Sequence, residues 1–166
     1  MSSRLDLPQA DTDEAERYRQ ACATALRLLA RREHSTRELA HKLQSRGCPA
    51  PVLDRVIAAL RDEGALSDRR FADSYTEARV ERGFGPLRIE AELRERGVDG
   101  ALIEAALASH ADDWVVSIRR QRRKRFGGQP PRDFTGRARQ MRFLQQRGFS
   151  GEQIREALTD GADADD

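Results

Sequence analysis

The chain has 166 residues, of which 38% are apolar and 35% are charged, and its formal net charge is +2. Because the apolar share is low for a globular protein, the composition excludes one thick hydrophobic core and favours several thin packed units. The two cysteines, Cys22 and Cys48, are too few for a disulfide framework and lack the C-x-x-C spacing of a metal site. No stretch is typical of a signal peptide or of the roughly 20 apolar residues that span a bilayer, so we expect a reduced cytoplasmic protein without membrane contacts.

The first group of predicted helices lies within residues 13–66. One face of its first helix is formed by Tyr18, Cys22, Ala25, Leu26 and Leu29, which recur at helical spacing. Ser35 and Glu38 have the spacing of a capping box and predict the start of a second helix. Gly47 is expected to end that helix, and a short turn then leads into a third.

The second group lies within residues 67–111. Ser67 and Asp68 predict the start of its first helix, whose apolar face is Phe71, Ala72, Tyr75 and Ala78. Gly85 and Pro86 suit the N-cap and first position of the next helix, because proline loses no hydrogen bond in a first turn. The third group, residues 112–159, keeps a weaker first helix marked by Val115, Ile118 and Phe126.

The three groups are copies of one pattern: Leu, two residues, Arg-Gly, five residues, Leu or Ile, three residues, Ile or Leu. The copies begin at Leu43, Leu93 and Leu144, at steps of 50 and 51 residues, which indicates an internal repeat. The glycines of the Arg-Gly steps, Gly47, Gly97 and Gly148, are each followed by an apolar residue. This pattern is typical of a helix that ends at a left-handed glycine.

We therefore predict an all-α protein of three tandem three-helix repeats that form an elongated array, with its curvature left open. The expected division is a flexible tail (1–12), repeat 1 (13–66), repeat 2 (67–111), repeat 3 (112–159) and an acidic tail (160–166). We expect a monomer, because polar tails can cover both ends of such an array.

Catalytic or metal-binding chemistry has little support in the sequence. His34, His41 and His110 lack the spacing of a zinc-binding helix, and the repeats place Ala91 and Arg142 where the first repeat has His41. Cys48 corresponds to Val98 and Phe149, which favours a small core residue over a nucleophile. We predict a binding or regulatory protein that is not an enzyme and has no cofactor.

Charge is distributed unevenly along the chain. Lys and Arg number 18 against 21 Asp and Glu in residues 1–113, 11 against 1 in residues 114–149, and 1 against 6 in residues 150–166. An exposed helix face normally mixes both signs, so this basic stretch predicts contact with an anionic partner. The candidate residues are Arg119, Arg120, Arg122, Arg123, Lys124, Arg125, Arg132, Arg137, Arg139 and Arg142.

Two segments carry a family resemblance: "LSDRRFADSYTEARVERGFGPLRIEAELRERGV" from Leu66 and "MRFLQQRGFSGEQIREAL" from Met141. They resemble the RecX family of bacterial regulatory proteins. The resemblance implies a modulator that binds the RecA filament on single-stranded DNA and limits its growth and its ATPase, strand-exchange and coprotease activities. Such a protein would modulate recombinational DNA repair and the SOS response. The partners we expect are the RecA filament and single-stranded DNA, with the DNA bound mainly through the third repeat and duplex DNA left open as a further partner.

Two alternatives remain open at this stage. Three-helix units with a basic patch also suit a tandem helix-turn-helix protein that binds duplex DNA directly, although the arginines are concentrated in one repeat. A structural adaptor for an acidic protein, with no nucleic acid in the complex, would need the same patch. Binding to DNA alone, compared with binding to DNA carrying RecA, separates these possibilities.

Overall fold

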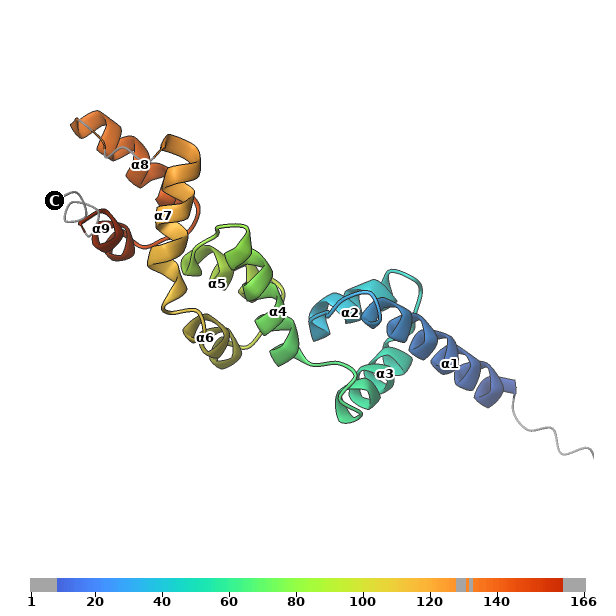
Figure 1. Cartoon of the computed structure of the whole chain (residues 1–166). Coiled ribbons are helices and arrows are strands. Elements are labelled where there is room, and N and C mark those ends of the chain that lie inside the picture. The colour runs from blue at the N-terminus through green and yellow to red at the C-terminus, as the bar shows by residue number, and fades with distance from the viewer. Residues whose placement is uncertain (1–8, 128–130, 132, 160–166) are drawn as a thin grey trace, which may run out of the picture. The chain divides into compact units, whose positions relative to one another are not determined.

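The structure, a computed structural model, describes residues 9–127, 131 and 133–159. These residues form helices and no strand, as Figure 1 shows, so the predicted all-α class is confirmed. The helices are α1 (Gln9–Leu29), α2 (Thr36–Gln44), α3 (Ala50–Asp62), α4 (Asp68–Glu81), α5 (Pro86–Glu95), α6 (Gly100–Ala108), α7 (Asp113–Phe126), α8 (Phe134–Gln146) and α9 (Gly151–Thr159).

The expected tails are only partly described. Helix α1 begins at Gln9, inside the segment 1–12 that was expected to be a flexible tail. A turn or two further along α1, Glu16 accepts hydrogen bonds from Arg19 and Gln20, and side-chain pairs three and four residues apart support a helix. Residues 1–8 and 160–166 lie outside the described residues.

The chain divides into two compact units between Phe71 and Ala72, a point within α4. In unit 1, α1, α2 and α3 pack around a core of Ala21, Ala25, Leu39, Leu43, Val52, Leu53, Val56, Leu60 and Leu66. The placement of Leu26 on the buried face of α1 is wrong, because its side chain is 50% exposed. The carboxylate of Asp68 accepts hydrogen bonds from the Thr36 backbone N–H (2.7 Å) and hydroxyl (2.8 Å), which joins the starts of α4 and α2.

Unit 2 contains most of α4 and all of α5 to α9. Its buried apolar residues are Ala72, Ile89, Leu93, Val98, Ile103, Ala106, Trp114, Ile118, Leu144, Phe149, Ile154 and Ala157. The inward face of α7 is formed by Trp114, Ser117, Ile118 and Gln121, whereas Val115 is only half-buried. Two of these four residues are polar, which explains why the apolar pattern of this helix is weak in the sequence.

Each Arg-Gly step ends its helix as predicted. Gly47, Gly97 and Gly148 have φ angles of 84°, 75° and 93°, in the left-handed region that favours glycine. The residue after each glycine donates its backbone N–H to the carbonyl oxygen of the repeat leucine: Cys48 to Leu43, Val98 to Leu93 and Phe149 to Leu144, each at 3.2 Å. This bond belongs to the Schellman ending of a helix and satisfies a carbonyl that the helix itself leaves unpaired.

The glycine of the third repeat also joins repeats 2 and 3 within unit 2. The backbone N–H of Gly85 donates to Arg147 O (2.8 Å), and that of Leu87 donates to Gly148 O (3.0 Å). A side chain at Gly85 would clash, because a Cβ atom there would lie 2.5 Å from the backbone of Gly148. The start of α5 therefore lies directly against the end of α8, and this contact packs the basic third repeat against repeat 2.

Candidate nucleic-acid and partner interface

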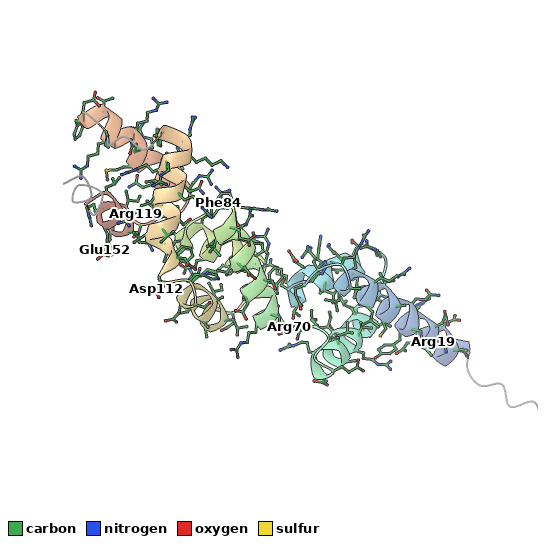
Figure 2. All side chains as sticks on the ribbon, viewed as in Figure 1. Arg19, Arg70, Phe84, Asp112, Arg119 and Glu152 are labelled. Atoms are coloured by element: carbon green, nitrogen blue, oxygen red, sulfur yellow. The ribbon has the colours of Figure 1, made fainter. Side chains whose placement is uncertain are left out.

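The basic residues of α7 fall into two groups. Arg123, Lys124 and Arg125 in its last turn are exposed, whereas Arg119 and Arg122 are half-buried. Cations in the last turn of a helix are favoured by the helix dipole, which partly offsets the repulsion among these like charges. Figure 2 labels Arg119 on this helix.

Arg120 has a structural role that the sequence did not suggest. Its guanidinium donates to Val80 O (3.3 Å) and Glu81 O (3.2 Å), the carbonyl oxygens at the end of α4. The sequence predicts that this guanidinium group binds an anionic partner, but these contacts occupy some of its N–H donors. The remaining donors of this exposed side chain are fewer, so Arg120 is a weaker candidate than its neighbours on α7.

The basic residues of α8 extend the same surface. Arg137, Arg139 and Arg142 are exposed, and Arg139 lies over the ring of Phe126 at 5.9 Å. Phe126 in turn meets Phe143 edge to face, with ring centroids 5.3 Å apart, and this contact holds the end of α7 against α8. Arg132, another candidate, lies outside the described residues.

A cationic surface follows from these positions, exposed except at the half-buried Arg122. We call it the α7–α8 basic surface: Arg122, Arg123, Lys124, Arg125, Arg137, Arg139 and Arg142. Within the described part of the chain, none of these side chains forms an ion pair with an acidic side chain. By contrast, the arginines of repeats 1 and 2 commonly pair with acids, for example Arg55 with Glu14 at 2.7 Å. The seven cations of the α7–α8 basic surface are thus available to an anion in solution.

Arg147 belongs to the same basic stretch of sequence but supports the structure. Its guanidinium donates to Arg82 O (3.1 Å) and Gly83 O (3.3 Å) and stacks over the rings of Phe84 (5.4 Å) and Phe143 (5.1 Å). The sequence could have indicated this structural role, because Arg147 is the arginine of an Arg-Gly step. Its contacts with residues of repeat 2 could not be predicted, because they depend on how repeats 2 and 3 pack.

Phe84 gathers three guanidinium groups at the junction of repeats 2 and 3, and Figure 2 labels it there. Besides Arg147, Arg88 lies 4.3 Å and Arg79 lies 5.1 Å from its ring centroid. Both of these arginines also pair with Glu92, at 3.1 Å and 2.7 Å. Cation–π contacts hold the three guanidinium groups against Phe84, and Glu92 also pairs with Arg79 and Arg88.

His34, Cys22 and Cys48 take part in packing rather than in a reactive cluster. His34 is buried: its Nδ1 lies 3.0 Å from Arg32 O and its Nε2 lies 3.1 Å from Lys42 Nζ. Burial lowers the pKa of His34 and raises the pKa of the Cys48 thiol, so both groups favour their neutral forms. Among the described residues, no group of three His, Cys, Asp or Glu side chains could hold a metal ion.

The described helices are also too short or too polar to cross a membrane. Their arrangement defines the class of this protein: a tandem array of three-helix repeats, whose last repeat carries an unpaired cationic surface.

Comparison with known proteins places this class in one family. The first, second and third three-helix domains of RecX match residues 21–60, 67–107 and 112–158. The protein named Regulatory protein RecX from Halorhodospira halophila is 48% identical over 142 residues, which cover 86% of this chain and 88% of that protein. The protein of the same name from Pseudomonas entomophila is 41% identical over 159 residues, 96% of each chain. The chain therefore belongs to the RecX family, and the resemblance drawn from its sequence is confirmed.

Solved structures agree with the fold. The crystal structure of RecX from Lactobacillus salivarius superposes with a TM-score of 0.77 and covers 89% of this chain and 98% of that chain, at 21% identity. A second crystal structure, titled regulatory protein RecX, has a TM-score of 0.80 and covers 96% of this chain. At this identity the comparison establishes the three-helix repeats alone.

Proposed function

We propose that the protein binds the RecA filament on single-stranded DNA and limits filament growth, and with it the ATPase, strand-exchange and coprotease activities. Its role would be to modulate recombinational DNA repair and the SOS response in the cytoplasm. Membership of a family whose members are named regulatory proteins supports a regulatory role. We propose that it acts by binding rather than by catalysis, since His34 and Cys48 are engaged in packing. We also propose that it acts as a monomer.

The α7–α8 basic surface is the observation that carries the proposal. Residues 114–149 hold 11 basic residues and a single acidic one, Asp133. The Asp133 carboxylate is engaged at the start of α8, where it accepts a hydrogen bond from the Gly136 N–H at 2.7 Å. A surface of mostly exposed cations without acidic partners suits the phosphates of DNA or an acidic face of a filament.

The test is the DNA-dependent ATPase of RecA on single-stranded DNA, with this protein added at substoichiometric ratios. We expect strong inhibition well below one copy per RecA. We expect half-inhibition to need at least about tenfold more of the variant Arg123→Ala, Lys124→Ala, Arg137→Ala, Arg142→Ala than of the unmodified protein. A loss of ~1.4 kcal/mol of binding free energy, shared among the four contacts, is enough for this tenfold change.

A matched control carries the same change of charge on unit 1: Arg31→Ala, Arg37→Ala, Arg61→Ala, Arg69→Ala, all at exposed positions. It should inhibit as the unmodified protein does. If the unmodified protein leaves the ATPase unchanged but binds bare duplex DNA in a salt-sensitive way, direct DNA binding by a helix-turn-helix-like array replaces our proposal.

A further inference from the structure

Phe134 stands apart from the other aromatic residues of the chain. Its side chain is 88% exposed, whereas Phe71 and Phe149 are buried and Phe84, Phe126 and Phe143 are half-buried in the contacts described above. Large exposed apolar residues are also rare elsewhere in the described chain: Leu26, Leu87 and Val116, none of them aromatic. An exposed phenylalanine adds little to folding, so its position calls for another explanation.

The turn that carries Phe134 is absent from the other repeats. Helices α2 and α5 begin at Thr36 and Pro86, seven residues before the repeat leucine, whereas α8 begins at Phe134, ten residues before Leu144. The additional turn, residues 134–136, contributes no buried side chain. The Asp133 side chain caps it through the Gly136 N–H, so the turn is held in place although the core does not need it.

Phe134 begins the helix that carries Arg137, Arg139 and Arg142 of the α7–α8 basic surface. Arg137 follows it by three residues on α8 and therefore shares its helix face. The exposed last turn of α7, with Arg123, Lys124 and Arg125, belongs to the helix that packs against α8. A protein pocket for a phenylalanine would itself be apolar and would not require cations of one sign around it. A polyanion with exposed aromatic groups would use both features.

Single-stranded nucleic acid has this combination of groups. Its phosphates bind basic side chains, and its unpaired bases stack on aromatic rings for ~1–3 kcal/mol each, whereas the bases of a duplex are already stacked. We propose that Phe134 stacks on an unpaired base of single-stranded nucleic acid whose phosphates contact the α7–α8 basic surface. This inference rests on the proposed function, because it requires nucleic acid at the third repeat.

The test uses two full-length variants and one probe, an oligo(dT) strand. Phe134→Ala should weaken binding to oligo(dT) by about 5- to 150-fold, the range that ~1–3 kcal/mol of stacking corresponds to. The same substitution should have no effect on binding to an abasic strand of equal length, which keeps the phosphates and lacks the bases. Since Phe134 is exposed, the variant should have the same melting temperature as the unmodified protein. Thermal unfolding followed by circular dichroism verifies this.

Phe134→Trp supplies a direct signal. The one native tryptophan, Trp114, is 6% exposed and serves as a constant background. Fluorescence of the new tryptophan should be quenched by oligo(dT) and not by the abasic strand, because quenching of this kind needs a base on the ring.

The outcomes separate the inference from the function beneath it. Equal oligo(dT) binding by Phe134→Ala and the unmodified protein overturns the stacking role, even where RecA inhibition by the unmodified protein stands. Unchanged oligo(dT) binding with weaker RecA inhibition would make Phe134 an anchor in a protein pocket, which also overturns it. Failure of the unmodified protein both to bind oligo(dT) and to inhibit RecA removes the proposed function itself.

Discussion

Glu92 binds three polar or charged side chains of repeat 2 through one carboxylate. Its carboxylate accepts a hydrogen bond from the Tyr75 hydroxyl (2.7 Å) and pairs with Arg79 and Arg88, and its side chain is only 16% exposed. Burial acts to raise the pKa of Glu92, but the hydrogen bonds from Tyr75 and Arg88 and the charges of both arginines outweigh it. The pKa of Glu92 is therefore lower in the folded than in the unfolded chain.

This lowered pKa adds a pH-dependent contribution to the stability of unit 2. A carboxylate with a lowered folded pKa stabilises the fold fully above its unfolded pKa, near 4.5, and loses that contribution as pH falls through the folded pKa. We expect Glu92→Gln to lower the free energy of unfolding at neutral pH by ~1.5–3 kcal/mol, the usual contribution of hydrogen bonds to a charged group. Below about pH 4 the difference from the unmodified protein should shrink.

Urea unfolding at several pH values measures this difference. Glu90→Gln on the same helix is the matched control, because Glu90 pairs with the exposed Arg94 and such pairs contribute ~0–1 kcal/mol. A difference between Glu92→Gln and the unmodified protein that stays constant from neutral to acidic pH would contradict the assigned role of the carboxylate.

At the scale of helices, the ends of α5 and α8 decide how repeats 2 and 3 join. Gly85 has φ −92°, which suits any residue, so the requirement for glycine there comes from its neighbour and not from its backbone. An added methyl group would lie 2.5 Å from Gly148 C and O and 2.6 Å from Phe149 N. Those backbone atoms belong to the helix ending that also receives the Leu87 N–H.

We expect Gly85→Ala to destabilise unit 2 by ~1–3 kcal/mol through overpacking. Gly100→Ala, also at the start of a helix, is the control: a Cβ atom there meets nothing within 4 Å, so the change should be neutral or slightly stabilising. Thermal unfolding followed by circular dichroism compares the two. Equal melting temperatures for both variants would mean that α5 and α8 do not meet as closely as these distances require.

The helix ends were predictable from sequence because their causes are local. A left-handed position favours glycine, and the three repeats supplied internal controls for it. A capping box requires a serine and a glutamate three residues apart, which the first repeat has. Ser35 caps α2 as expected, since its hydroxyl accepts the Glu38 N–H at 3.1 Å. Comparison of Cys48 with Val98 and Phe149 likewise identified a packing position, and Cys48 packs against the unit 1 core.

The candidate interface was predictable only in part, because exposure depends on contacts between repeats. Sequence found the basic stretch but treated its arginines alike, whereas Arg120 and Arg147 bind carbonyl groups that lie 39 to 65 residues earlier in the chain. Phe134 was missed for a related reason: the pattern gave no cause to expect that α8 has an additional turn.

At the scale of the whole molecule, charge is separated along a chain that is nearly neutral overall. The excess of basic residues in 114–149 is opposed by an excess of acidic residues on both sides of it in the sequence. A polyanion would therefore be attracted by the basic region rather than by the chain's net charge. Salt dependence distinguishes attraction by this region from attraction by the net charge, because the slope of log K against log salt concentration is proportional to the number of phosphates contacted.

We expect log K for oligo(dT) binding to fall linearly with log salt concentration. Each phosphate contact removed should lower the slope by ~0.7, so Arg123→Ala with Lys124→Ala should reduce its magnitude by about 1.4. Arg61→Ala with Arg69→Ala removes the same charge from exposed positions of unit 1 and should leave the slope unchanged. If both double variants reduce the slope equally, the net charge of the chain governs binding and the third repeat has no special part in it. A reduction confined to Arg123 and Lys124 would mean that these cations contact phosphates themselves, because only a direct contact changes the number of counterions released.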